Sequence, residues 1–124
     1  MEMEIEQIYN HSYFDRLIKF RVIKKDDTII YCDYLDISFI INKVNIFIKT
    51  IDEFTNEYDI KNNEIYEDDI IEYTQHYFNM NKTDVKRKVV KWDKLKCGWN
   101  IHETNAGQTN HKIIGNIHQN PELI

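Results

Sequence analysis

Apolar and polar residues alternate along short segments of the first half of the chain, the pattern of half-buried β-strands. Residues 17–23 (LIKFRVI) and 28–35 (TIIYCDYL) flank the polar pair Asp26 and Asp27. Aspartate is a frequent turn residue because its side chain bonds the backbone two positions on. The two segments therefore predict a β-hairpin.

The pattern after this hairpin has two interpretations. Residues 37–41 are apolar, and residues 44–51 (VNIFIKTI) alternate again. Three successive strands would form a β-meander, which is the fold we expect for the first half. The alternative is a short helix over residues 35–42.

Residues 52–64 are rich in polar turn formers, so we expect a loop there and a boundary between two units. The expected units are residues 1–51, an N-terminal arm and the meander, and residues 52–124, a second β unit. The two units can also pack as a single domain. Over residues 4–14 the sequence is compatible with a short helix or with an arm used in self-association.

The second half predicts further strands. Residues 64–77 lead into a strand, and residues 79–83 read as a turn. Residues 85–92 and 97–101 predict a hairpin with lysines on its outer face. Residues 112–117 predict a last strand, which the proline that follows would stop. The fold class is therefore mainly β with minor α.

Composition supports a folded chain. The 124 residues are 42% hydrophobic and 13% aromatic, which argues against a disordered protein. Cys32 and Cys97 form no CxxC pair, so we expect reduced thiols, with Cys97 partly buried. No apolar run approaches the roughly 18 residues of a membrane span, so we expect no membrane partner and a cytoplasmic location.

Charge is distributed unevenly around a net value of −5. Residues 52–72 hold nine acidic and one basic residue, a local charge of −8. Residues 82–96 hold seven basic and two acidic residues, a local charge of +5. Each segment is either a solvated face or part of a dipolar surface suited to head-to-tail self-association. We expect a homo-oligomer.

No catalytic constellation is visible. No pair of histidines has the spacing of a zinc finger or an HExxH helix, and no glycine-rich phosphate loop occurs. Two spatial assemblies are left open: a metal site from Cys97, His102 and His111, and a thiol nucleophile at Cys97 with His102 as its base. The expectation is no catalytic residue, no metal and no cofactor.

Recognition is the remaining chemistry. Cationic side chains next to aromatic rings can hold a base and its phosphates. The candidate ligand-binding residues, all from the second half, are Tyr73, Tyr77, Phe78, Lys86, Arg87, Lys88, Lys91, Trp92 and Trp99. The alternative is that both tryptophans are core and the lysines protect a sheet edge.

Three blocks resemble the YopX-like proteins of phages and prophages. Residues 17–22 (LIKFRV) are similar to the family's opening, residues 59–71 (DIKNNEIYEDDII) to its central block, and residues 114–123 (IGNIHQNPEL) to its C-terminal motif. Asp59 and Asp68 stand where the family has glycines. The resemblance implies a phage or prophage origin and a β-rich fold, with an SH3-like barrel in the C-terminal unit.

These observations predict a non-enzymatic phage or prophage accessory protein that acts by binding. The expected role is counter-defence or host takeover, either by blocking a host protein or by sequestering a small nucleotide signal. The alternative is a phage regulatory protein that binds nucleic acid through the basic hairpin at residues 82–96.

Overall fold

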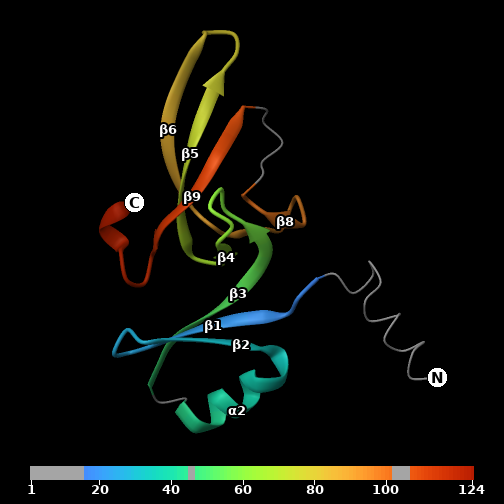
Figure 1. Ribbon diagram of the computed structural model, residues 1–124, viewed down its shortest axis with the longest axis vertical. Coiled ribbons are helices and arrows are strands. Elements are labelled where there is room, and N and C mark those ends of the chain that lie inside the picture. The colour runs from blue at the N-terminus through green and yellow to red at the C-terminus, as the bar shows by residue number, and fades with distance from the viewer. Residues whose placement is uncertain (1–15, 45–46, 102–106) are drawn as a thin grey trace, which may run out of the picture.

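The computed structural model describes residues 16–44, 47–101 and 107–124, and it is mainly β, as the sequence predicts. The molecule is elongated, with a helix at one end and a long hairpin at the other (Figure 1). The predicted N-terminal helix or arm at residues 4–14 lies outside the described residues.

The first sheet has four antiparallel strands: β1 (Lys19–Lys24), β2 (Ile29–Asp33), β3 (Ile48–Tyr58) and β4 (Glu64–Tyr66). Their spatial order is β2-β1-β3-β4. The two hydrogen-bonded neighbours of β1 are therefore β2, which follows it directly, and β3, which follows the helix.

The β1–β2 hairpin forms at the predicted turn. The Asp26 carboxylate accepts hydrogen bonds from the Thr28 backbone N–H at 3.0 Å and from its hydroxyl at 2.6 Å. These bonds lower the pKa of Asp26. Asp27 takes a φ of 68°, the left-handed conformation that aspartate tolerates well.

Helix α2 (Tyr34–Val44) follows β2, so the short-helix alternative is confirmed and the β-meander is wrong. Asp33 caps the helix, because its Oδ1 accepts the backbone N–H groups of Leu35 at 3.0 Å and Asp36 at 3.1 Å. The helix carries the chain away from β2, and β3 then pairs with the opposite edge of β1.

Strand β3 corrects the first part of the loop predicted over residues 52–64, because the strand runs on to Tyr58, and only residues 59–63 form a turn. Two polar residues of the strand, Asp52 and Thr55, are buried partners rather than turn formers. Asp52 is fully buried, and the Thr55 hydroxyl donates to the Ile65 carbonyl at 2.7 Å. The boundary expected after residue 51 falls inside this strand, which pairs with β1 on one side and β4 on the other.

The second sheet has three antiparallel strands in the order β6-β5-β9: β5 (Asp69–Tyr77), β6 (Lys82–Val89) and β9 (Gln108–Asn116). A separate pair of short strands, β7 (Trp92–Asp93) and β8 (Gly98–Trp99), lies beside it. The β5–β6 hairpin projects beyond the rest of the molecule (Figure 1).

Two details of the second unit differ from prediction. The hairpin expected between residues 85–92 and 97–101 is reduced to the β7–β8 pair, because β6 pairs with β5 instead. Within the described ranges the strands do not close into a barrel: β6 and β9 are the edges of an open three-stranded sheet.

The C-terminal strand contains an irregularity beside Gly115. Ile70 pairs with Gly115, whereas the next residue, Ile71, pairs with Ile113, so the register shifts by one. A Cβ atom on Gly115 would lie 2.6 Å from the Asn120 side-chain oxygen, so only glycine allows this close approach. The chain then ends in a short 3₁₀ helix, Pro121–Leu123.

The main apolar core lies between the second sheet and the segments packed on it. Its buried members are the aliphatic residues Ile65, Ile71, Val90 and Ile101. The partly buried Trp99 and Ile113 pack against them. Among the described residues, no helix is long and apolar enough to cross a membrane.

Candidate functional site

A buried charge network joins the two sheets. Arg21 from β1 is 5% exposed, and it lies between Asp52 of β3 and Asp69 at the start of β5, which are 0% and 2% exposed. The guanidinium donates to Asp52 Oδ2 from Nε at 3.1 Å and from Nη2 at 2.8 Å, and to Asp69 Oδ1 from Nη1 at 2.5 Å. Burial lowers the pKa of Arg21, but the two carboxylates outweigh that effect, so the pKa is raised.

The second Asp69 oxygen and the neighbouring backbone complete this network. Asp69 Oδ2 accepts the Tyr66 backbone N–H at 2.8 Å, and Arg21 Nη2 donates to the Glu67 carbonyl at 3.2 Å. The turn between β4 and β5 is thus held onto β1 by charge-assisted hydrogen bonds.

The network continues to the C-terminal turn. His118 Nε2 lies 2.9 Å from Asp68 Oδ2 and 3.4 Å from Asp52 Oδ1. Asp68 also forms an ion pair with Lys91. Because Asp52 contacts both Arg21 and His118, one continuous polar cluster crosses the molecule.

Asp52, Asp68 and His118 are the group that could hold a metal ion within the described part of the chain, with ligand atoms within 4.8 Å of one another. Arg21 and Lys91 already neutralise carboxylates of this cluster. His118 Nε2 lies within hydrogen-bonding distance of Asp68 Oδ2, so the carboxylates of this cluster already have partners on the same chain.

Sequence reasoning missed this cluster, although all its members except Asp52 and Lys91 come from the blocks that carry the family resemblance. Arg21 lies in residues 17–22, Asp68 and Asp69 in residues 59–71, and His118 in residues 114–123. The sequence signal that could have revealed the cluster is the presence of these charged residues within the three resembling blocks. Asp68 takes a φ of 69°, which explains why the family can have glycine there.

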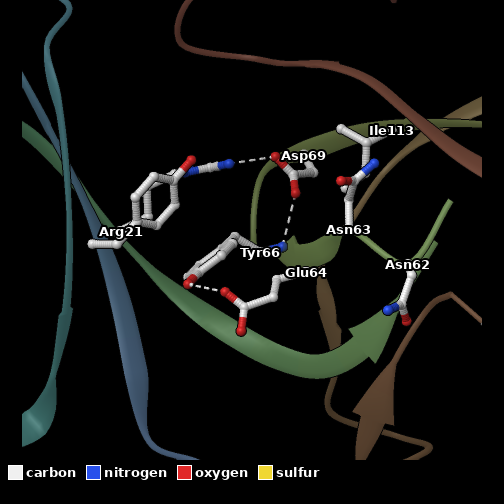
Figure 2. A pocket seen from close by; sticks show the side chains of 8 residues that line it. Arg21, Asn62, Asn63, Glu64, Tyr66, Asp69 and Ile113 are labelled. Carbon is white, nitrogen blue, oxygen red and sulfur yellow. Dashed lines mark hydrogen bonds and ion pairs between the residues drawn. The ribbon is translucent and has the colours of Figure 1, made fainter.

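A hollow of about 510 Å³ opens beside the Arg21–Asp69 pair (Figure 2). Its lining combines charged, amide, aromatic and aliphatic side chains: Arg21, Tyr31, Asn62, Asn63, Glu64, Tyr66, Asp69 and Ile113. The Tyr66 hydroxyl donates to Glu64 Oε1 at 3.2 Å, and burial, together with Glu64, raises the pKa of Tyr66.

The aromatic rings of this hollow are packed on one another. The Tyr31 and Tyr66 centroids lie 5.6 Å apart, and the Arg21 guanidinium lies 5.2 Å from the Tyr66 centroid. Tyr66 is 1% exposed, whereas Tyr31 is 59% exposed. Tyr31 is therefore the ring on which a planar ligand could stack.

Four of the predicted ligand residues share one face of the β5–β6 hairpin. In the antiparallel register, Tyr73 pairs with Lys86. Lys88 lies two positions from Lys86 and Tyr77 lies four positions from Tyr73, so all four side chains point to the same face. Lys86 Nζ lies 5.3 Å from the Tyr77 centroid, and Lys88 Nζ lies 4.6 Å from that of Tyr73. A hydrogen bond to Tyr77 raises the pKa of Lys86.

Two of these four residues are engaged inside the fold. Tyr73 is 9% exposed and stacks on His111 with centroids 5.5 Å apart. Lys88 Nζ donates to the Ile101 carbonyl at 3.0 Å and to Gln108 Oε1 at 2.9 Å. Tyr77 and Lys86 remain accessible at the hairpin surface.

The other predicted residues lie elsewhere. Phe78 is at the hairpin tip and 74% exposed. Arg87 is on the opposite face, where its Nε donates to Glu72 at 3.2 Å and its Nη1 to the Leu123 carbonyl at 2.9 Å. Lys91 faces Asp68, away from the hairpin face.

The two tryptophans form their own pair on β7 and β8. Their centroids lie 5.4 Å apart in an edge-to-face arrangement. Trp99 packs on the core, and its buried Nε1 has no hydrogen-bond partner among the described residues. Trp92 is 43% exposed. The nine predicted residues therefore form several separate features rather than one continuous strip.

Cys97 is exposed, which corrects the expectation of a partly buried thiol. It lies in the β7–β8 turn with a φ of 51°, and its Sγ lies 3.6 Å from the Lys94 carbonyl oxygen. Its suggested partner His102 lies outside the described residues.

Comparison with known proteins agrees with the convergence of the three blocks. The family model described as YopX protein matches residues 5–124, which is nearly the whole chain. No curated protein matches the sequence. The chain therefore belongs to the YopX protein family.

Proposed function

We propose that this protein is a non-enzymatic accessory protein that acts by binding a host protein, in counter-defence or host takeover. Membership of the YopX family suggests a phage-type protein. The observation that carries the proposal is the β5–β6 hairpin, which projects from the rest of the molecule (Figure 1). Its tip carries exposed apolar side chains.

The tip has the chemistry of a docking element. Phe78 and Met80 are 74% and 68% exposed, and a hydrogen bond of 3.0 Å from the Met80 backbone N–H to the Tyr77 carbonyl closes the turn that presents them. Aromatic side chains and methionine are enriched in protein interfaces. A rigid hairpin loses little conformational entropy on binding, which favours affinity.

Charge around the tip points to the character of the partner. Lys82 and Lys86 flank Tyr77, with their Nζ atoms 5.9 Å and 5.3 Å from its centroid. The hairpin therefore suits an apolar pocket with an acidic rim on the host protein.

Sequestering a nucleotide signal is the second form of the same role, and the hollow of Figure 2 is its best location. Tyr31 offers a stacking face, and Asn62 and Asn63 offer amide groups. The guanidinium of Arg21 is already shared by two carboxylates, so the hollow favours a base over a phosphate. We therefore rank protein binding first.

Affinity capture from bacterial host lysate tests the hairpin. The full-length protein should retain a host protein that the Phe78→Ser/Met80→Ser variant loses, because the tip supplies the apolar contact. Leu95→Ser is the matched control, since Leu95 is an apolar side chain 97% exposed in a different turn. Retention of the same host proteins by all three forms would reject the hairpin as the docking element.

The alternative function is a regulator that binds nucleic acid through the basic segment 82–96. The observation that favours it is the row of Lys82, Lys86 and Tyr77 on one face. The net charge of −5 opposes it, because phosphate neutralisation dominates nucleic-acid affinity. Gel shifts at rising salt decide the matter: a salt-sensitive shift abolished by Lys82→Ala/Lys86→Ala would support it, and no shift at low salt would exclude it.

A further inference from the structure

Helix α2 leaves its apolar side chains uncovered. From Tyr34 to Lys43 no side chain is buried, and only Ile37 and Ile40 are half-buried. The exposed apolar members, with their exposed fractions, are Tyr34 at 57%, Leu35 at 70%, Phe39 at 63% and Ile41 at 36%.

A helix of 11 residues cannot rely on its own hydrogen bonds. Isolated helices of this length are marginal in water, and most helical stability in proteins comes from packing an apolar face. Clustered exposed apolar side chains mark interaction surfaces. Helix α2 therefore requires a cover that this chain does not supply within the described residues.

The outward stripe of the helix is centred on Phe39. At 100° per residue, Leu35, Asp36 and Lys43 lie within about a right angle of Phe39 around the helix axis. The Lys43 Nζ lies 5.6 Å from the Phe39 centroid, so both side chains occupy this stripe. Ile37 and Ile40 lie about 160° and 100° from Phe39 around the axis and are half-buried, and the helix contacts β1 and β2.

The charges of this stripe are self-complementary. Asp36 lies in the first turn and Lys43 in the last turn, and both face the same way because about two turns separate them. Their midpoint falls between Phe39 and Ile40. A twofold axis at that point would set Asp36 of one copy against Lys43 of the other, twice, with the two Phe39 rings between them.

We infer that α2 packs antiparallel against α2 of a second copy of this chain, forming a symmetric dimer. A twofold contact uses the same patch on both subunits, so one acidic and one basic residue at equal distances from the axis form two identical ion pairs. Helix α2 lies at the end of the molecule opposite the β5–β6 hairpin, so the dimer leaves both hairpin tips free (Figure 1). This inference stands independently of the proposed function.

Charge-swap variants of the full-length chain test the dimer. Sedimentation or light scattering over a concentration series should show a dimer for the wild type. Asp36→Lys and Lys43→Asp should each weaken it about tenfold or more, because each places like charges together twice. The Asp36→Lys/Lys43→Asp double variant should restore the dimer, because the opposite charges meet again.

Two further variants make the test decisive. Phe39→Ala keeps a good helix former and removes the central ring, so it should weaken the dimer about tenfold or more while the circular dichroism spectrum stays unchanged. Lys96→Asp, in an exposed turn, is the matched charge control and should leave the dimer intact. A wild type that stays monomeric, or a dimer indifferent to Phe39→Ala and to both single charge reversals, would overturn the inference.

Discussion

Arg21 is the side chain on which the junction of the two sheets depends. Its guanidinium bonds Asp52 of the first sheet and Asp69 of the second, and all three groups are buried. Replacing a whole buried ion cluster by apolar residues can be neutral, but removing one member leaves an uncompensated buried charge. Arg21 is therefore required by the carboxylates around it.

We expect Arg21→Met to lower the free energy of unfolding by about 3–5 kcal/mol, because Asp52 and Asp69 would lose their common cation. Urea denaturation of the purified protein measures this directly. The matched control is Arg16→Met, which removes an ion pair with Glu53 whose side chains are 58% and 43% exposed. That control should change stability by less than about 1 kcal/mol, and equal losses in both variants would contradict the role assigned to Arg21.

Asp59 is another buried acidic residue with a structural role, although the family has glycine at its position. Its Oδ1 accepts the backbone N–H groups of Lys61 at 3.0 Å and Asn63 at 2.8 Å, and its Oδ2 accepts that of Ile113 at 3.1 Å. Burial raises the pKa of Asp59, but these donors outweigh burial and the pKa is lowered. The carboxylate form therefore fastens the turn to β9.

A lowered pKa makes the Asp59 contribution depend on pH. The contribution is complete above the pKa of the unfolded chain and is lost as pH falls through the lower pKa of the folded protein. Asp59→Asn should cost about 1.5 kcal/mol at neutral pH, and this difference should shrink at pH values below the folded pKa. Unfolding curves of both proteins at neutral and acid pH measure the change.

Thr55→Val is the control for this pH effect. Its hydroxyl donates to the Ile65 carbonyl at 2.7 Å and cannot titrate in this range. The cost of Thr55→Val should stay constant across the same pH values. A constant cost for Asp59→Asn as well would show that the carboxylate charge is not what holds the turn.

At the scale of elements, helix α2 is the weakest part of the fold, because none of its side chains from Tyr34 to Lys43 is buried. Its start depends on Asp33, which accepts the N–H groups of Leu35 and Asp36. Local caps matter most where tertiary packing contributes least.

We expect Asp33→Ala to destabilise the helix by about 1 kcal/mol, because two backbone N–H groups lose their acceptor. Hydrogen exchange of the α2 amides should accelerate, while exchange in β5 and β9 should not change. Asp33→Asn keeps an oxygen acceptor at the cap and should behave like the wild type. Equal acceleration in the alanine and asparagine variants would mean that charge, rather than the cap, is responsible.

At the scale of the whole molecule, the acidic and basic segments seen in the sequence lie against each other. Glu72 pairs with Arg87 at 3.2 Å, and Asp68 pairs with Lys91. Part of the apparent dipole is therefore neutralised inside each molecule. This arrangement favours an apolar contact, such as helix α2, over charge alone as the basis of any self-association.

The C-terminal turn ties distant parts of the chain together. Ile117 donates its N–H to the Asp68 carbonyl at 3.0 Å, and His118 contacts Asp68 and Asp52. Gln119 Nε2 donates to the Asp27 carbonyl at 2.9 Å, and Lys49 Nζ donates to the His118 carbonyl at 2.8 Å. The family motif is thus a connector between the two sheets.

Deleting residues 117–124 should lower the free energy of unfolding by about 3 kcal/mol or more, because the hydrogen bonds of Ile117, His118 and Gln119 to the rest of the chain are lost together. Both sheets should lose hydrogen-exchange protection together. Deleting only residues 122–124 removes the Arg87 contact with the Leu123 carbonyl but keeps His118, so its effect should be smaller. Loss of protection confined to the second sheet would contradict the connector role.

Sequence by itself determined the features that depend on neighbouring residues. Alternation located β1, β2 and β5, and the Asp26–Asp27 pair located the first turn, because side-chain direction and turn chemistry are local properties. The three similar blocks identified the family for the same reason. Helix α2 remained an alternative, since a short apolar run suits helix or strand.

Tertiary structure alone decided what depends on distant partners. A polar segment has the same sequence pattern whether water or a buried charged side chain satisfies its polar groups. Residues 52–58 therefore resembled a loop, because the sequence does not show that Arg21 is the partner of Asp52. Strand pairing follows nonlocal packing, which is why β3 lies beside β1 and why β6 joins β5 rather than the tryptophan pair. The nine candidate ligand residues were separated for the same reason: proximity in sequence does not determine which face a side chain occupies once the strands have paired.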